Sequence, residues 1–164
     1  MGMQLPGELI GLLGMLGYTW PEADETKLFE LGNTWMGLAS TLQSGAADAD
    51  AVAQRIWTDN KGEDFDAFRT EWSGAESASQ NLADSANGCL MVSVGLMVAA
   101  IVVLALKIQV IVQLIMLAIQ IAQAIATAPV TFGASLAQIP IFKTIAGIVI
   151  DLLIDQAIQA LLND

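Results

Sequence analysis

Residues 57–65 read Trp-Thr-Asp-Asn-Lys-Gly-Glu-Asp-Phe, and this stretch decides the fold because it separates two long helical patterns. Asp59-Asn60-Lys61-Gly62 is a cluster of turn-forming residues, and the acidic pair after it is typical of the first turn of a helix. A short turn between two long helices predicts an antiparallel helical hairpin.

Before the turn, apolar residues recur with alternating spacings of three and four, which predicts one helix from about residue 22 to residue 58. The sequence Trp-Pro-Glu-Ala-Asp-Glu at 20–25 suits its start, because proline and acids favour a first helical turn. We expect the packing seam of this helix to begin with Leu28, Leu31, Trp35, Leu38 and Leu42.

After the turn, the same spacing runs through Phe65, Phe68 and Trp72 to Cys89 and predicts one uninterrupted second helix. The triplet Trp72-Ser73-Gly74 falls inside this predicted helix, where we expect it to have no role as a turn. Core packing is the simplest role for Trp35, Trp57 and Trp72, and recognition of a partner is the alternative.

The turn resembles that of the WXG-type helical hairpins exported by type VII secretion. In that family a Trp ends the first helix and further aromatic residues follow, and Trp57, Phe65 and Trp72 fit this pattern, with Asp59 where the family has Gly and Gly62 closing the turn. The resemblance implies pairing with small WXG-type hairpin proteins or with a second copy, and contact with the type VII secretion machinery.

A closer resemblance is to the WXG-like N-terminal domains of actinobacterial polymorphic toxins, including the channel-forming necrotizing-toxin type. It rests on the opening at 20–25, the seam with Trp35, and the segment Thr131-Phe132-Gly133 that interrupts a hydrophobic continuation. The resemblance implies an export and assembly module of a toxin whose catalytic domain lies outside these residues.

The family's export tag is a Tyr followed four residues later by Asp or Glu, placed after a hairpin. Tyr18 and Glu22 have this spacing but precede the hairpin, so they are a candidate export tag, with packing of Tyr18 near Trp20 as the alternative.

The hydrophobic half begins at Cys89, and residues 89–106 contain no charge, which meets the usual threshold for a membrane span. Beyond Lys107, a polar stripe lies on one face of the continuing helix: Gln109, Gln113, Gln120 and Gln123. Three interpretations stay open, namely a solvent-facing edge, an amide ladder between protomers, and a water-facing pore lining.

Residues 141–162 predict a last helix that folds back on the preceding one. Its Asp151 and Asp155 are interpreted as a solvated stripe, since no nucleophile or second acid–base group accompanies them.

The composition excludes several classes of protein. The chain of 164 residues has six basic and 17 acidic residues, a net charge of −11 and no His. A nucleic-acid surface needs clustered cations, and Ser-His-Asp hydrolysis or His-based zinc binding needs His. We therefore expect no enzyme, no catalytic or metal-binding residues, no cofactor and no nucleic-acid partner.

Together these patterns predict an all-α fold: a long antiparallel helical hairpin with a hydrophobic helical extension and a returning C-terminal helix. Its segments are a short N-terminal helix at 1–19, the WXG-like hairpin at 20–88, and the extension and return at 89–164, which we expect to form one structural unit. The first function hypothesis is a non-enzymatic export and assembly domain of a type VII secreted toxin. The alternative is a membrane channel or toxin-translocating element built from residues 89–162.

The opening residues 1–18 lack the cationic start of a signal peptide and carry Glu8. We therefore expect secretion without a cleaved signal and association with the cell envelope or a membrane.

Overall fold

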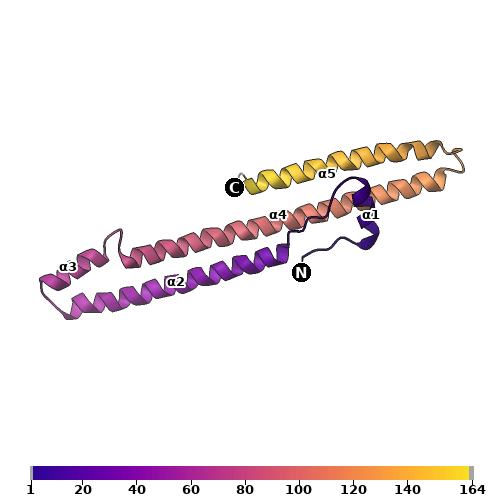
Figure 1. Cartoon of the computed structure of the whole chain (residues 1–164). Helices are drawn as coiled ribbons and strands as arrows, with labels where there is room; N and C mark the ends of the chain where they lie inside the picture. Colours follow the sequence, from indigo (N-terminus) through magenta and orange to yellow (C-terminus); the bar gives the residue numbers. More distant parts are fainter. Residues whose placement is uncertain (1, 163–164) are drawn as a thin grey trace. The chain divides into compact units, whose positions relative to one another are not determined.

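The computed structural model describes residues 2–162 and contains helices but no strand in that range. The elements are α1 (Gly7–Met15), α2 (Glu25–Asp59), α3 (Glu63–Trp72), α4 (Ala78–Thr127), the 3-10 helix η1 (Ala134–Gln138) and α5 (Ile139–Leu162) (Figure 1). The predicted all-α fold is confirmed, and the first turn lies between Asp59 and Glu63 as predicted.

The second helix is not continuous, so that prediction is wrong. It is divided into α3, which ends at Trp72, and α4, which begins at Ala78. The amide of Gln80 donates a 3.1 Å hydrogen bond to the Ser77 hydroxyl. Ser77 and Gln80 thus form the start of a new helix in a capping arrangement that periodicity alone does not reveal.

The chain divides into two compact units, which are described separately. One comprises the residues up to Lys27 together with those from Val98 onward, and the other comprises Leu28–Met97. The three segments inferred from the sequence remain a prediction about domain organisation. The long helices α2 and α4 each contribute residues to both units.

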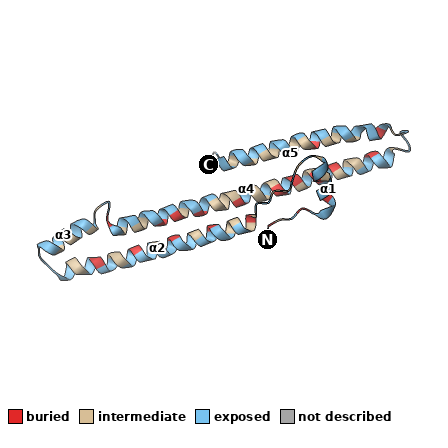
Figure 2. Cartoon of the chain, in the orientation of Figure 1, coloured by how far each residue is buried: buried red, intermediate tan, exposed pale blue. Residues whose placement is uncertain are grey.

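In the unit Leu28–Met97, α2 and α4 lie side by side and meet through small residues (Figures 1 and 2). The buried positions of α2 recur at every seventh residue: Gly32, Ala39, Ala46 and Ala53. On α4, Ala86 and Ser93 have the same spacing and no exposed surface. Small side chains in register allow two helix backbones to approach closely.

The closest approach is at Gly32. The Ser93 hydroxyl donates a buried 2.8 Å hydrogen bond to the Gly32 carbonyl. A Cβ at residue 32 would lie 3.1 Å from the Met97 Cγ atom and 3.2 Å from the Ser93 carbonyl oxygen. A larger residue would therefore separate the helices or strain them.

The position of the seam corrects the sequence prediction. Leu31 and Leu38 were expected in the seam but are 47% and 44% exposed, while Leu28, Trp35 and Leu42 are half-buried. The buried line lies one residue further along the helix, because close contact between small residues leaves no space for leucine side chains between the backbones. The large apolar residues consequently flank the contact.

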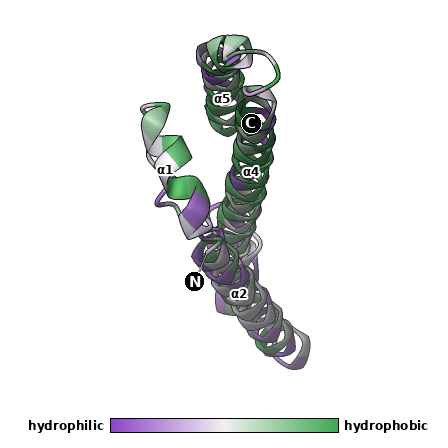
Figure 3. Cartoon of the chain, turned by 90° about the vertical axis from the view of Figure 1, so that its right-hand side faces the viewer, coloured by the Kyte–Doolittle hydropathy of each residue, from purple (hydrophilic) through white to green (hydrophobic). Residues whose placement is uncertain are grey.

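The other unit has a core formed by α1, α4 and α5. Its buried members are Leu5, Leu9, Leu13, Val110, Leu114 and Ile150. Helix α5 returns along α4, and α1 covers part of both helices through its leucines. Helices α4 and α5 consist mostly of hydrophobic residues (Figure 3). Only 17% of the most apolar stretch of Ala78–Thr127, and likewise of Ala134–Leu162, is buried, so much apolar surface remains uncovered.

We predict that Gly32→Val lowers the free energy of unfolding by about 1–3 kcal/mol, since the added carbons enter a full contact. Gly37 lies on the same helix with no atom within 4 Å of an added Cβ. Gly37→Ala is the matched control and should stabilise the chain by about 0.5–1 kcal/mol through helix propensity. Urea unfolding followed by circular dichroism measures both, and equal effects of the two substitutions would contradict the close contact.

Candidate functional site

The turn residues singled out in the sequence lie where α2 and α3 meet. Asp59 is the exposed last residue of α2, and Gly62 precedes α3 with a φ of 142°, a backbone conformation that favours glycine. Phe65 is half-buried in the first turn of α3. The backbone conformation at position 62 therefore favours glycine, whereas the side chain of Asp59 is exposed to solvent.

Three aromatic rings connect α2 with α3. The ring centroid of Phe68 lies 5.8 Å from that of Trp57 and 5.6 Å from that of Trp72, both in tilted arrangements. Such offset contacts are favourable for aromatic pairs. Trp57 of α2 is thus held against α3, while Trp72 packs on Phe68 within α3, and both tryptophans remain half-buried.

Trp72-Ser73-Gly74 is at a helix break, which corrects the expectation that this triplet lies inside a helix. Trp72 is the last residue of α3, and the Gly74 amide donates a 3.1 Å hydrogen bond to the Glu71 carbonyl. A Cβ at residue 74 would lie 3.1 Å from that same carbonyl oxygen. The W-x-G sequence therefore forms a turn in this chain.

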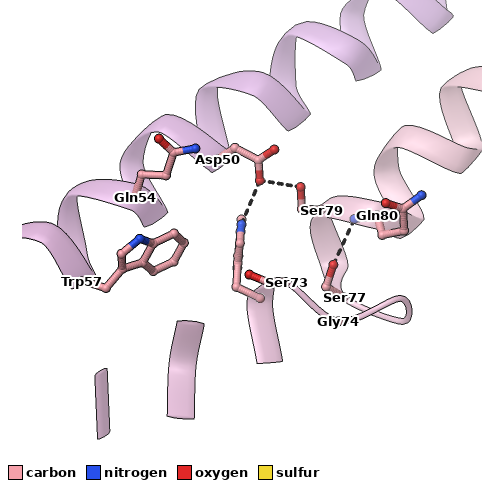
Figure 4. A pocket seen from close by; sticks show the side chains of 9 residues that line it. Asp50, Gln54, Trp57, Ser73, Gly74, Ser77, Ser79 and Gln80 are labelled. Atoms are coloured by element: carbon pink, nitrogen blue, oxygen red, sulfur yellow. Dashed lines mark hydrogen bonds between the residues drawn. The ribbon is translucent and has the colours of Figure 1, made fainter. Parts of the chain in front are cut away.

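Asp50 of α2 fastens this turn to the hairpin. Its Oδ1 atom accepts hydrogen bonds from the Ser79 hydroxyl at 2.5 Å and from the Trp72 indole N–H at 2.8 Å. These two donors lower the pKa of the Asp50 carboxyl. An open pocket of about 240 Å³ lies beside them, lined also by Gln54, Trp57, Ser77 and Gln80 (Figure 4).

The second polar cluster was missed by the sequence analysis and centres on Lys107 of α4. Lys107 is 2% exposed, and its Nζ atom lies 2.8 Å from the Glu25 carboxylate and donates a 2.6 Å hydrogen bond to the Ala23 carbonyl. The Trp20 ring lies 5.8 Å from the ammonium, within cation–π range. Lys107 thus joins the chain before α2 to the middle of α4.

Glu25 completes the cluster from the other side, because its second oxygen accepts a hydrogen bond from the Met3 amide. Burial by itself would raise the pKa of the Glu25 carboxyl, but the hydrogen bonds from Lys107 and Met3 outweigh burial and lower the pKa. The charged carboxylate therefore stabilises the fold above its unfolded-state pKa, and this contribution is lost as the pH falls. We call the cluster of Met3, Trp20, Ala23, Glu25 and Lys107 the N-terminal clamp.

Tyr18 and Glu22, the candidate export tag, are not brought together by the structure. Residues 18–24 are outside the helices, so a four-residue spacing does not place two side chains on one face. The Tyr18 hydroxyl donates a 2.6 Å hydrogen bond to Asp151 and approaches the Gly147 carbonyl at 3.1 Å, whereas Glu22 is exposed. The bond to Asp151, together with burial and the carboxylate charge, raises the pKa of Tyr18 to about 12.

The glutamine stripe on α4 is accessible. Gln109 and Gln123 are exposed, and Gln113 and Gln120 are half-buried. Gln109 also lines a shallow groove with Leu153 and Gln156 of α5. None of the four side chains is enclosed by this chain, so the groups remain free to meet water or a partner.

Groups of three or more acidic, His or Cys side chains that could hold a metal ion do not occur within residues 2–162. The two polar clusters, one around Asp50 and one around Lys107, hold segments of the chain together. The exposed helix surfaces are the remaining candidates for a functional site.

Long helices that fold back on one another at the turn between Asp59 and Glu63 define a helical-hairpin protein. The chain matches the family model of the WXG100 like domain over residues 4–149, and it belongs to this family. Members of this family typically act in type VII secretion and pair as helical hairpins. Searches of curated proteins and of solved structures gave no match to the chain.

We predict that Lys107→Met destabilises the fold by about 3–5 kcal/mol, because Glu25 is left buried without its cation. Replacing both residues, in Glu25→Met with Lys107→Met, should recover most of this loss, since apolar side chains can replace a buried pair. Lys143→Met is the control, because Lys143 is half-buried and its ammonium has a weak 3.8 Å contact with the Met15 sulfur. Denaturant unfolding measures the three variants, and an unchanged midpoint for Lys107→Met would refute the clamp.

Proposed function

We propose that this chain is a non-enzymatic export and assembly module of a type VII secreted toxin. In this proposal the hairpin pairs through α2 with a small WXG-type hairpin protein or with a second copy of the chain. Family membership supports the link to type VII secretion. The single observation that carries the pairing is the open apolar face of α2.

We define the α2 face as the line Leu31, Leu38 and Val52, which are spaced by multiples of seven residues. Their side chains are 47%, 44% and 60% exposed. Half-buried large residues lie beside them along the helix, namely Leu28, Trp35 and Leu42. This is the heptad pattern of a coiled-coil seam, and it remains uncovered because α4 packs against the small residues next to it.

A second amphipathic helix is the occupant that this face suits. Apolar knobs at alternating spacings of three and four interdigitate with the same spacing on a partner helix. Because the small-residue contact holds α2 and α4 together independently of this face, a partner can dock without opening the hairpin. The complex would be a bundle of four or more helices.

The remaining parts of the proposal concern delivery. We propose that the module is exported without a cleaved signal and acts at the cell envelope, with any toxic activity in a separate domain. The lack of His in the sequence supports the non-enzymatic assignment. Tyr18 and Glu22 remain the candidate tag for the secretion machinery, with Tyr18 released from Asp151 on recognition.

We predict that Leu31→Glu with Leu38→Glu abolishes association with the partner while the chain keeps its helix content, because the carboxylates would be buried at the interface. Ser44→Glu is the matched control, since Ser44 is exposed on the same helix outside the α2 face. Light-scattering mass, alone and after co-expression with a small WXG-type protein, measures association. Full association of the double variant, or equal loss with Ser44→Glu, would refute the proposed face.

A membrane channel or translocation element is the second candidate function. Two helical segments, Ala78–Thr127 and Ala134–Leu162, are long and apolar enough to cross a membrane by length and composition, and little of each is buried. The accessible glutamine stripe supports a water-facing lining, because polar residues within a membrane usually face a cavity.

For a channel, we predict that Gln113→Leu with Gln120→Leu reduces dye leakage from liposomes several-fold, since the polar lining is lost. Gln43→Leu on α2 is the control, because Gln43 is exposed outside the channel-forming segment. If the unmodified chain releases no dye at any protein concentration or pH, the channel candidate is rejected, and the pairing proposal is unaffected.

A further inference from the structure

Two large apolar side chains are exposed in the connection between α4 and α5. Val130 is 81% exposed and Phe132 is 99% exposed. Phe132 has a φ of 54°, in the left-handed region that a bulky side chain rarely adopts. Strained residues that persist in a fold are often found at sites of binding. We call residues 128–138 the α4–α5 tip.

The region around the tip is free of charge. No charged residue occurs between Lys107 on α4 and Lys143 on α5, although the chain carries a net charge of −11. Water-soluble loops at the end of a helical hairpin are usually polar, because their backbone and side chains are solvated. An uncharged and mostly apolar tip on an acidic chain instead fits an environment with few water molecules.

The hydroxyl groups in the tip and at the end of α4 beside it form hydrogen bonds within the chain. Thr127 donates to the Gln123 carbonyl at 2.9 Å, Thr131 donates to the Thr127 carbonyl at 3.0 Å, and Ser135 donates to the Ala124 carbonyl at 2.7 Å. An unsatisfied hydroxyl costs several kcal/mol when it leaves water. Because these hydroxyls have internal partners, they can leave water without that penalty.

The position of the first charge sets how far the tip can enter an apolar layer. On α5, Lys143 is separated from residue 133 by the first residues of α5 and by η1. A rise of 1.5 Å per residue in an α-helix and 2.0 Å in a 3-10 helix gives about 16 Å from Lys143 to residue 133. That length is about half of the 30 Å hydrocarbon core of a bilayer.

We propose that the α4–α5 tip inserts into one leaflet of a phospholipid bilayer, with Val130 and Phe132 in the acyl chains and Lys143 at the level of the headgroups. A lysine at that depth can extend its ammonium to the lipid phosphates. This insertion goes beyond the pairing of the hairpin and does not require any helix to cross the membrane. The partner is the lipid surface itself.

Insertion is tested by an environment-sensitive NBD fluorophore on the full chain. In a Cys89→Ala background, NBD is attached at Phe132→Cys, and phosphatidylcholine vesicles are added. The fluorescence should rise several-fold, with the strongest quenching by nitroxides deep in the acyl chains. The control is NBD at Met91→Cys, an apolar residue of α4 that is 77% exposed and distant from the tip in sequence.

A second measurement compares variants by co-sedimentation with the same vesicles. Val130→Asp with Phe132→Asp should reduce the bound fraction about tenfold, because two apolar anchors are lost. Phe132→Leu should retain binding, Met91→Asp should bind like the unmodified chain, and added salt should have little effect.

Several outcomes would overturn the inference. One is an unchanged fluorescence of NBD at residue 132 when vesicles are added, which means that the probe stays in water. Another is an equal loss of vesicle binding for Met91→Asp and for the tip variant, which indicates general adhesion of apolar surface. If the tip substitutions change the light-scattering mass without vesicles, the tip is a protein contact. Failure of the pairing proposal would instead appear only in the α2 variants, so the two results are separable.

Discussion

The contact on which the rest of the structure depends is the close packing of α2 against α4 through small residues at seven-residue intervals. Because Gly32, Ala39 and Ala46 are buried, the two backbones approach until no large side chain fits between them. Leucines beside this contact are therefore displaced to its edge. The open α2 face that we propose for pairing is a direct consequence of how tightly the hairpin itself closes.

The N-terminal clamp performs a related task in the other unit. Lys107 is a cation in the middle of a long apolar helix, and a charge there is costly unless it is paired. Glu25 and the Ala23 carbonyl supply the pairing, and they also fix where the chain enters α2. The same ion pair thus compensates the charge of Lys107 within the apolar part of α4 and secures the N-terminal segment.

The acidic and the apolar residues of the chain are concentrated in different segments. The acidic residues are concentrated before residue 89, where they solvate the hairpin, while α4 and α5 keep a large apolar surface that the chain does not cover. A partner helix would cover the apolar face of α2, and a lipid leaflet would cover the apolar tip between α4 and α5. An exposed apolar surface of this extent commonly marks an interaction site.

The sequence by itself determined the all-α class, a first turn near Asp59–Gly62, the returning last helix and the WXG-type family, because these depend on local periodicity and turn residues. It did not determine which face of α2 is buried: leucine and alanine lines lie side by side, and only the approach of α4 selects alanine. The break at Ser73–Ser77 and the Lys107–Glu25 pair also required the tertiary structure. The ion pair joins residues far apart in the chain, and the break is held by Asp50 of α2, which accepts hydrogen bonds from Trp72 and Ser79 on its two sides, in addition to the local capping bond of Ser77.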